Sequence, residues 1–405
     1  MLCLLMSGCW DRREINQLGI VSTAAFDKEG DEVVVTVEIF QSELGEAGAA
    51  QGTAGSGRAS LTAQGRGLTA ASAIRDLARK VSRRVYWPHT QAVIVGEELA
   101  GEGLTEILDL WNREVELRRT AMMLIARGKA WDVVTGVHRG LESTISDEIA
   151  GLERSSRFNG YTTVSSIHDI IRSSEAGNGT ALTGLIEIAE AEQPPTERSP
   201  VPGEAARALE PVKTKMIQLA GLAILKNGKL ENICMASPLS RGLLIVNNRV
   251  TSTMVNIECP CDMDGLDEPG HYTAVKVTSV KAQIEIADAG TNPSAAIKVN
   301  IDMNLSGQQC DANITDPETI REIERRTAKV IETEILESVQ QAKDVPCDPF
   351  GFAGAFHRKD PQAWNKVQDN WDNVFAGMKV QVKVEACLRQ AGAVKGHSWR
   401  SLKAY

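Results

Sequence analysis

The chain has 405 residues, enough for two or three domains of roughly 150 residues each. Apolar residues make up 42% and charged residues 24%, which excludes a disordered or collagen-like chain. Its 44 Lys and Arg against 53 Asp and Glu give a net charge of -9, which argues against binding nucleic acid through phosphates. Beyond the first few residues, no apolar run approaches the roughly 20 residues that span a bilayer. We therefore expect folded domains surrounded by water.

The first nine residues have the order of a bacterial lipoprotein signal. An apolar stretch at 1–6 precedes the small Ser7 and Gly8, and Cys9 follows directly. Small side chains let a peptidase reach the backbone, and the Cys9 thiol is the nucleophile that takes a diacylglyceryl group. Two acyl chains anchor better than one, because each buried methylene contributes about 0.8 kcal/mol. The segment predicts lipid attachment at Cys9.

Two features of this N-terminus differ from a complete signal. The apolar stretch is shorter than the usual run of about 7 to 15 residues, and no basic region precedes it. A start codon placed too late would produce this pattern. The alternative interpretation is an ordinary apolar N-terminus with a buried cysteine.

The next part of the chain predicts a mixed sheet covered by helices. Residues 20–26 and 33–40 are apolar and β-branched around turn residues 27–31, the pattern of a β-hairpin. Residues 44–60 are rich in Gly, Ala, Ser and Thr and predict a mobile surface loop. Helices alternate with strands thereafter, which favours a mixed sheet. The expected helices are 70–81 and 99–111, and the expected strands are 92–95 and 120–126.

The middle of the chain has weaker patterns. Short helices are expected around 145–152 and 165–172, and the prolines of 193–211 predict a linker. A strand at 218–225 should end in a turn at 226–229 and pair back with 185–188. Further strands are expected at 243–246, 250–257, 274–286 and 297–305.

The strongest local signals lie near the C-terminus. Residues 315–318, Thr-Asp-Pro-Glu, combine a cap, a proline in the first turn and an acidic charge, and apolar positions then repeat at helical spacing to about 343. Asp360 and Pro361 open a second helix, expected to run to about 377. Residues 379–388 alternate between apolar and polar, which predicts a half-buried strand.

These elements predict an α/β fold, with α and β elements mixed, in a three-domain architecture of mixed sheets packed with helices. The C-terminal domain should contain antiparallel strands and the long helix 316–343. The expected parts are a lipoprotein signal remnant 1–8, an N-terminal mixed α/β domain 9–133, a middle domain 134–238 with its proline-rich linker, a C-terminal domain 239–391 and a basic tail 392–405.

The sequence contains no established catalytic motif. GxSxG, HExxH, Walker A and GxGxxG patterns are absent. Acidic neighbours such as Asp147 and Glu148 are expected by chance among 53 acidic residues, and the histidines are scattered. We therefore predict no enzyme and no cofactor. The histidines are His89, His138, His168, His271, His357 and His397.

The cysteines beyond Cys9 give no clear site. Cys259 and Cys261 with His271 could be offered as metal ligands, but a CxC pair lacks the second close pair that zinc sites usually show. We expect no metal there and mostly buried free thiols, although an exported protein permits disulfides. These cysteines are Cys234, Cys259, Cys261, Cys310, Cys347 and Cys387.

One family resemblance begins directly after Cys9, at Trp10, Asp11, Arg12, Arg13 and Glu14. The segment 8–16 resembles the N-terminal signature of the Ger(x)C family, the lipoprotein C subunits of spore germination receptors. The likeness extends from Cys9 to about residue 389. Its further motifs are 82–89, 91–99, 241–244, 348–352, 357–359 and Trp364.

This resemblance implies a lipoprotein held by diacylglyceryl Cys9 on the outer face of the cell membrane, which is the inner membrane in the spore. It implies A-type and B-type membrane subunits of a nutrient germinant receptor as partners, and no catalysis. The signature 10–14 lies within five residues of Cys9, so it should sit at the lipid headgroups, where its charges can pair with lipids or partner subunits. A solvated tether without a partner is the alternative. The chain departs from the family in loop 44–60, its extra cysteines and its basic tail.

Two other functions remain open. A free-standing lipoprotein could capture a small solute between two domains, and saturable binding of an amino acid or sugar would favour it. An exported hydrolase is disfavoured by the missing motifs. Four aromatic residues near the C-terminus are expected to pack in a core rather than form a ligand cage: Phe350, Phe352, Trp364 and Trp371.

Overall fold

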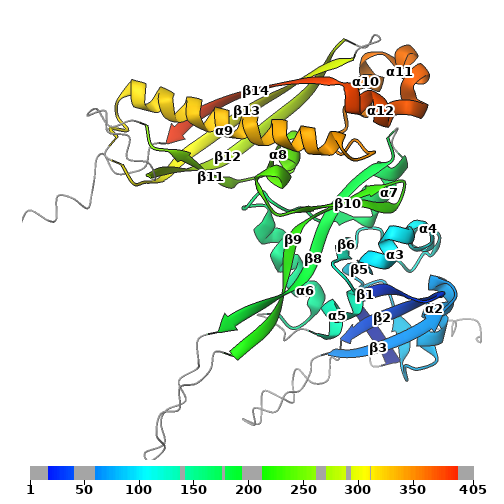
Figure 1. Cartoon of the computed structure of the whole chain (residues 1–405). Coiled ribbons are helices and arrows are strands. Elements are labelled where there is room, and N and C mark those ends of the chain that lie inside the picture. The colour runs from blue at the N-terminus through cyan, green and yellow to red at the C-terminus, as the bar shows by residue number, and fades with distance from the viewer. Residues whose placement is uncertain are drawn as a thin grey trace, which may run out of the picture. The chain divides into compact units, whose positions relative to one another are not determined.

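The computed structural model describes residues 17–40, 60–136, 142–175, 178–193, 212–260, 271–288, 293–310 and 312–390. Within it the chain forms two compact units, which Figure 1 shows with their elements labelled. The first comprises Met1–Ala150 and Glu187–Gln218, and the second comprises Gly151–Ile186 and Leu219–Tyr405. The expected three-domain boundaries stay a prediction.

The N-terminal hairpin is confirmed. β1 (Leu18–Glu29) pairs antiparallel with β2 (Glu32–Phe40) around a tight turn. β3 (Ser60–Gly67), which the sequence did not predict, pairs antiparallel with β2. Few of its residues are β-branched or aromatic, so its sequence carries little strand signal. The rest of the expected loop 44–60 lies outside the described residues.

The first unit has the mixed sheet that the sequence predicts. β1 pairs in parallel with β4 (Arg84–Tyr86) and β5 (Ala92–Gly96), and β5 pairs in parallel with β6 (Met122–Ala126). Parallel strands need crossover connections, which helices supply. The connection from β1 to β5 contains α2 (Ala70–Ala78), and the connection from β5 to β6 contains α3 (Glu97–Glu102) and α4 (Thr105–Arg113). After β6 come α5 (Ala130–Thr135) and α6 (Ile145–Ser156), and α6 continues into the second unit.

The single helix expected at 99–111 is wrong, because the structure has two helices there. Gly103 separates α3 from α4 with φ 142° and ψ 146°. This backbone region is essentially restricted to glycine, and it cannot continue a helix. The apolar spacing carries on across the break, which explains why periodicity alone suggested one helix.

The strands around the expected linker are present. β8 (Thr180–Gln193) lies next to β9 (Val212–Lys226), which confirms the expected pairing, and linker residues 194–211 lie outside the described part of the chain. β9 and β10 (Lys229–Met235) form a hairpin through the expected turn. β7 (Ser165–Ser166) and α7 (Ile167–Glu175) precede them, and α7 confirms the second short helix.

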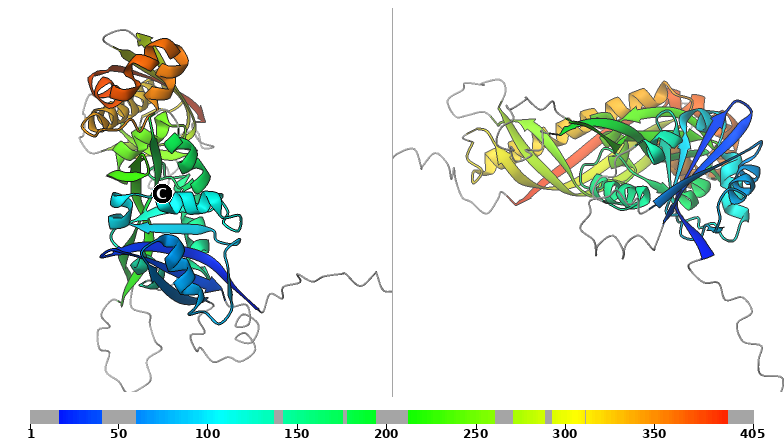
Figure 2. Two further views of the ribbon diagram at one scale, coloured as in Figure 1. Left: turned by 90° about the vertical axis from the view of Figure 1, so that its right-hand side faces the viewer. Right: turned by 90° about the horizontal axis from the view of Figure 1, so that it is seen from below.

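The second unit is built on a four-stranded sheet in the order β11 (Thr253–Glu258), β12 (Tyr272–Asp288), β13 (Ser294–Gln308) and β14 (Lys379–Gln390). The first three strands are antiparallel, and β14 is parallel to β13. Between β13 and β14 the chain passes through α9 (Pro317–Lys343), which confirms the long helix and packs on one face of the sheet (Figure 2). Val380, Val382 and Val384 of β14 contribute to this core, as their alternation predicts.

Two expectations for the second unit are wrong. Residues 243–246 belong to a helix, α8 (Pro238–Val246), instead of a strand. Every residue from Ser240 to Val246 is buried, so the apolar run has no periodicity that could identify a helix. The helix expected from Pro361 to 377 is broken by a 3-10 turn at Gln368–Asn370. Its parts are α11 (Pro361–Val367) and α12 (Trp371–Gly377), and α10 (Phe352–Lys359) precedes them.

Candidate functional site

The sequence places its candidate site at Cys9 and at Trp10, Asp11, Arg12, Arg13 and Glu14, all of which lie outside the described residues. Lipid attachment at Cys9 therefore stays a prediction. The other motif segments are described, and the contacts of those at 82–89, 241–244 and 348–352 show what they do.

The motif at 82–89 positions the start of β5. The carbonyl of Trp87 accepts the backbone N–H of Thr90 at 2.8 Å, and the Trp87 side chain is 7% exposed. The next residue, Gln91, donates its N–H to the carbonyl of Ser22 and accepts the N–H of Met122. The motif thus starts β5 between β1 and β6.

The motif at 241–244 joins two helices through a buried ion pair. Arg241 of α8 donates Nε to Glu334 Oε2 of α9 at 2.9 Å, and its Nη2 donates to Oε1 of the same carboxylate. Its Nη1 donates to the Tyr161 hydroxyl at 3.0 Å and to the Met254 carbonyl at 2.7 Å. A side chain at Gly242 would lie 2.6 Å from the Glu334 carbonyl, so only glycine allows this approach. The motif holds α8 against α9.

The motif at 348–352 is a turn around a buried carboxylate. Asp348 accepts the backbone N–H groups of Phe350 at 3.1 Å, Gly351 at 3.0 Å and Ala353 at 2.7 Å. It also accepts Nε1 of Trp371 at 3.2 Å. Burial raises the pKa of Asp348, and these hydrogen bonds oppose the rise. The carboxylate starts α10 and ties it to α12.

The C-terminal aromatic residues form a core, as expected. Their neighbouring ring centroids lie between 5.1 Å and 6.3 Å apart, and each ring is almost completely buried. Such a closely packed, buried cluster has no space for a ligand. Its members are Phe350, Phe352, Phe356, Trp364, Trp371 and Phe375.

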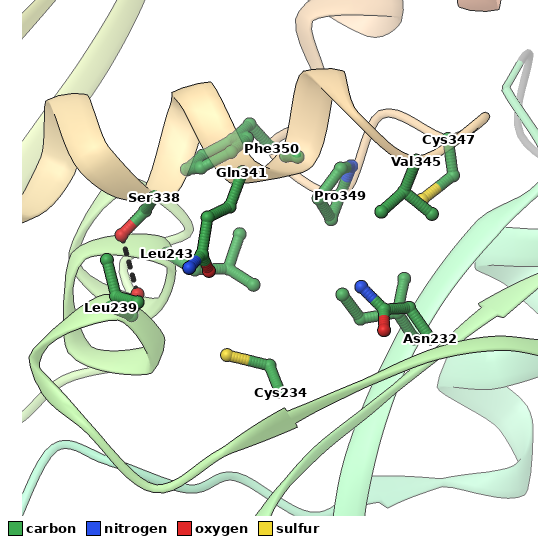
Figure 3. A pocket seen from close by; sticks show the side chains of 12 residues that line it. Asn232, Cys234, Leu239, Leu243, Ser338, Gln341, Val345, Cys347, Pro349 and Phe350 are labelled. Carbon is green, nitrogen blue, oxygen red and sulfur yellow. Dashed lines mark hydrogen bonds between the residues drawn. The ribbon is translucent and has the colours of Figure 1, made fainter.

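A small cavity in the second unit lies between β9, β10, α8, the end of α9 and the turn that follows it (Figure 3). Its volume is about 30 Å³, room for a water molecule but not for an amino acid or a sugar. Asn232, Gln341, Cys234 and Cys347 line it. Burial raises the pKa of Cys234, and it raises the pKa of Cys347 to about 12. Both thiols are therefore protonated at neutral pH and are poor nucleophiles.

Most of the described cysteines are free, as expected, but one pair is bonded. Cys259 and Cys310 form a disulfide, with Cα atoms 6.1 Å apart, which links the ends of β11 and β13. Cys234, Cys347 and Cys387 are free, and Cys261 lies outside the described residues. The disulfide uses the Cys259 sulfur, and no group of three or more His, Cys, Asp or Glu within the described ranges could hold a metal.

Two carboxylates of the first unit are buried, which the sequence did not predict. Glu38 of β2 is fully buried and accepts the hydroxyls of Ser22 at 2.8 Å and Ser60 at 2.9 Å, and the N–H of Ile145 at 3.0 Å. Asp27 of β1 accepts backbone N–H groups at the start of α5, and burial raises its pKa. Each is a lone acidic residue within an apolar strand, and this sequence pattern could have identified both.

The acidic neighbours Asp147 and Glu148 serve helix α6. Asp147 accepts the Thr144 hydroxyl at 2.7 Å, and Glu148 accepts the N–H of Glu142 at 3.3 Å. Both therefore stabilise the start of the helix. Among the helices that the structure describes, none combines the length and apolarity needed to cross a bilayer.

Comparison with known proteins adds the following. Residues 11–188 match the family model of the spore germination protein N-terminal domain, and residues 220–392 match that of spore germination B3/GerAC like, C-terminal. From Bacillus subtilis (strain 168), spore germination protein KC is 24% identical over 396 residues, with 96% of this chain and 93% of the relative covered. Spore germination protein B3 is 22% identical over 384 residues, with 93% and 91% covered. The crystal structure of the GerBC protein has a similar fold, with a TM-score of 0.54 at 16% identity, over 90% of this chain and 96% of that chain.

Proposed function

Since the chain belongs to the GerAC family of spore germination proteins, we propose that it acts as the lipid-anchored C subunit of a nutrient germinant receptor. The observation that carries the proposal is the pair of matching family domains at 11–188 and 220–392. Relatives that are themselves named as germination proteins align over at least nine-tenths of their own length. The chain therefore aligns with these relatives over most of their length.

The anchor that we propose is a diacylglyceryl group on Cys9. Nine residues lead from Cys9 to Leu18, where β1 begins, and an extended chain of that length spans about 30 Å at most. A lipid at Cys9 would therefore hold the first strand within about 30 Å of the bilayer surface. The mixed charges of Asp11 to Glu14 would lie at the headgroups, where they can pair with lipids or with neighbouring subunits.

The partners that we propose are the A-type and B-type membrane subunits of the receptor, and the subunit itself performs no catalytic step. The carboxylates buried in the structure support this scaffold role. Asp27, Glu38 and Asp348 each accept backbone N–H groups that start helices. These carboxylates therefore use their hydrogen-bonding capacity to stabilise the fold.

The test is an affinity pull-down from detergent-solubilised spore membranes, with this chain and its Cys9→Ala variant expressed as tagged baits. We expect the wild-type chain to stay in the membrane fraction, to carry a diacylglyceryl Cys9 by mass spectrometry, and to recover A-type and B-type subunits. We expect the variant to fold normally but to leave the membrane and to weaken germination. Cys387→Ala, a free and partly exposed thiol, is the matched control.

Recovery of the wild-type chain alone and without lipid would contradict the proposal. Unchanged membrane retention of Cys9→Ala would contradict the anchor specifically. In the first case, the free-standing solute-binding lipoprotein becomes the leading alternative. Calorimetry with amino acids and sugars would then test that role.

A further inference from the structure

Three Asn-Gly pairs occur in the second unit. Asn159-Gly160 follows α6, Asn178-Gly179 precedes β8, and Asn227-Gly228 forms the turn between β9 and β10. An asparagine before a glycine can lose its side-chain amide without an enzyme, because glycine has no Cβ to shield its backbone nitrogen. That nitrogen can then reach the side-chain carbon Cγ of the asparagine. The three pairs share this chemistry, so their contacts decide which of them reacts.

The first pair, Asn159 and Gly160, is held by hydrogen bonds. Oδ1 of Asn159 accepts the N–H of Tyr161 at 3.0 Å, and Gly160 donates its N–H to the Ser156 carbonyl at 3.1 Å. Gly160 is also buried, and a Cβ placed on it would lie 2.9 Å from Cβ of Thr253. Two hydrogen bonds must therefore break before the Gly160 nitrogen can attack Asn159.

The second pair is held through the side-chain amide of Asn178. Its Nδ2 donates to the carbonyl of Asp348 at 2.7 Å, and its Oδ1 accepts the N–H of Thr180 at 3.4 Å. The amide cannot turn toward the Gly179 nitrogen until both hydrogen bonds break.

The third pair, Asn227 and Gly228, has neither kind of restraint. Asn227 is exposed, and within the described ranges its side chain forms no hydrogen bond and the Gly228 N–H donates none. The backbone N–H of Asn227, which takes no part in the reaction, donates to the Gly179 carbonyl at 2.7 Å. Lys229 follows Gly228, and its positive charge favours loss of the proton from the Gly228 nitrogen. Since neither reacting group has a hydrogen bond to break, opening for the reaction costs least at this pair.

From these contacts we propose that Asn227 is a site of spontaneous deamidation in the folded protein. The Gly228 nitrogen gives up its proton and bonds to Cγ of Asn227, the side-chain nitrogen takes a proton and leaves as ammonia, and a cyclic imide remains. Water then adds to either carbonyl of the ring, which opens to aspartate or to isoaspartate. One water is consumed and one ammonia is released, so the step balances without an oxidant or a reductant. The inference does not rest on the receptor role.

Isoaspartate at position 227 should loosen the end of the hairpin. It carries the chain through its side chain, which adds one backbone atom to a two-residue turn between the register partners Lys226 and Lys229. The turn has φ of 49° at Asn227 and 74° at Gly228, a conformation that matches two residues to the twist of the flanking strands. The hydrogen bond from Asn227 to Gly179, which ties the turn to the start of β8, should be lost with this conformation.

The experiment incubates the purified full chain at mildly alkaline pH and follows the three Asn-Gly pairs by mass spectrometry of proteolytic peptides. Each hydrogen bond that must break first should slow the reaction about fivefold, so Asn159 and Asn178 should react about 25-fold more slowly than Asn227. The same chain unfolded in guanidinium is the matched control, because there the three pairs should react at similar rates. This comparison needs no variant and so does not depend on refolding.

Hydrogen exchange then tests the effect on the hairpin. After incubation, the amides of β9 and β10 next to the turn should exchange faster than in fresh protein. Asn227→Gly keeps the positive φ and has no amide to lose, so its exchange should not change with incubation. Reaction of Asn159 or Asn178 as fast as that of Asn227 in the folded chain, the same 25-fold ranking in the unfolded chain, or an Asn227 that stays intact in the folded chain while the unfolded chain reacts completely would each overturn the proposal. None of these results bears on the membrane pull-down, so the two proposals fail separately.

Discussion

Replacing Arg241 by methionine would leave Glu334 as a buried carboxylate without its cation. The two side chains are 5% and 8% exposed, so water cannot compensate for the lost partner. Breaking a buried pair from one side costs about 3–5 kcal/mol of the free energy of unfolding. The Tyr161 hydroxyl and the Met254 carbonyl also lose a donor, which adds about 1 kcal/mol each. Arg241→Met should therefore destabilise the second unit strongly.

The double variant Arg241→Met/Glu334→Leu removes both charges together. It should recover at least about 2 kcal/mol relative to the sum of the single variants, because no buried charge remains. The measurement is urea unfolding followed by circular dichroism, carried out on the two single variants, the double variant and the wild type. Lys298→Met provides the control, since its partner Glu285 and Lys298 itself are about half exposed, and it should cost less than about 1 kcal/mol.

If the losses of unfolding free energy in the two single variants simply add in the double variant, this reasoning is refuted. Additivity would mean that Arg241 and Glu334 do not interact energetically, whatever their geometry. A control as damaging as Arg241→Met would refute it as well. In that case burial would not be the cause of the difference.

Three further predictions concern the same unit. Glu324 and Glu332 of α9 accept N–H groups on the outer edge of β14, so replacing both by alanine should expose that edge and cause further self-association in analytical ultracentrifugation. A sedimentation coefficient equal to that of the wild type would contradict this. The pKa of Asp348 is raised above its unfolded value of 3.8, so its contribution to stability is present below pH 3.8 and is lost as pH rises through the folded pKa. The stability lost in Asp348→Asn should therefore be larger at pH 4 than at pH 7, and the reverse order in urea unfolding would refute it. Removing the disulfide with Cys259→Ala should cost about 2–5 kcal/mol in the same assay, and adding a reductant to the wild type should reproduce the loss.

Local sequence signals predicted the elements that carry their own start signals or a clear period. The Asp316 side chain caps α9, and Pro317 stands in its first turn, as the residue types predict. β14 alternates over a sheet with only one buried face, so its period is visible. The family resemblance likewise rests on local motifs, and the matching family domains confirm it.

The candidate site was predicted only in part. The motifs at 241–244 and 348–352 were found, but their roles depend on partners far away in the chain. Arg241 meets Glu334, and Asp348 meets Trp371. The proposed Cys9 anchor stays a prediction from sequence.

The sequence by itself determined the mixed α/β class, the capped long helix and the alternating strands, because caps and periodicity act over a few residues. Only the tertiary structure decided that residues 243–246 are helical, that Cys259 pairs with Cys310, and which carboxylates are buried. An apolar run that is buried on all sides has no hydrophobic periodicity from which a helix or a strand could be predicted. The disulfide joins cysteines 51 residues apart in the sequence. Its formation, like the burial of a charge, depends on which distant segments come into contact, and tertiary packing alone decides those contacts.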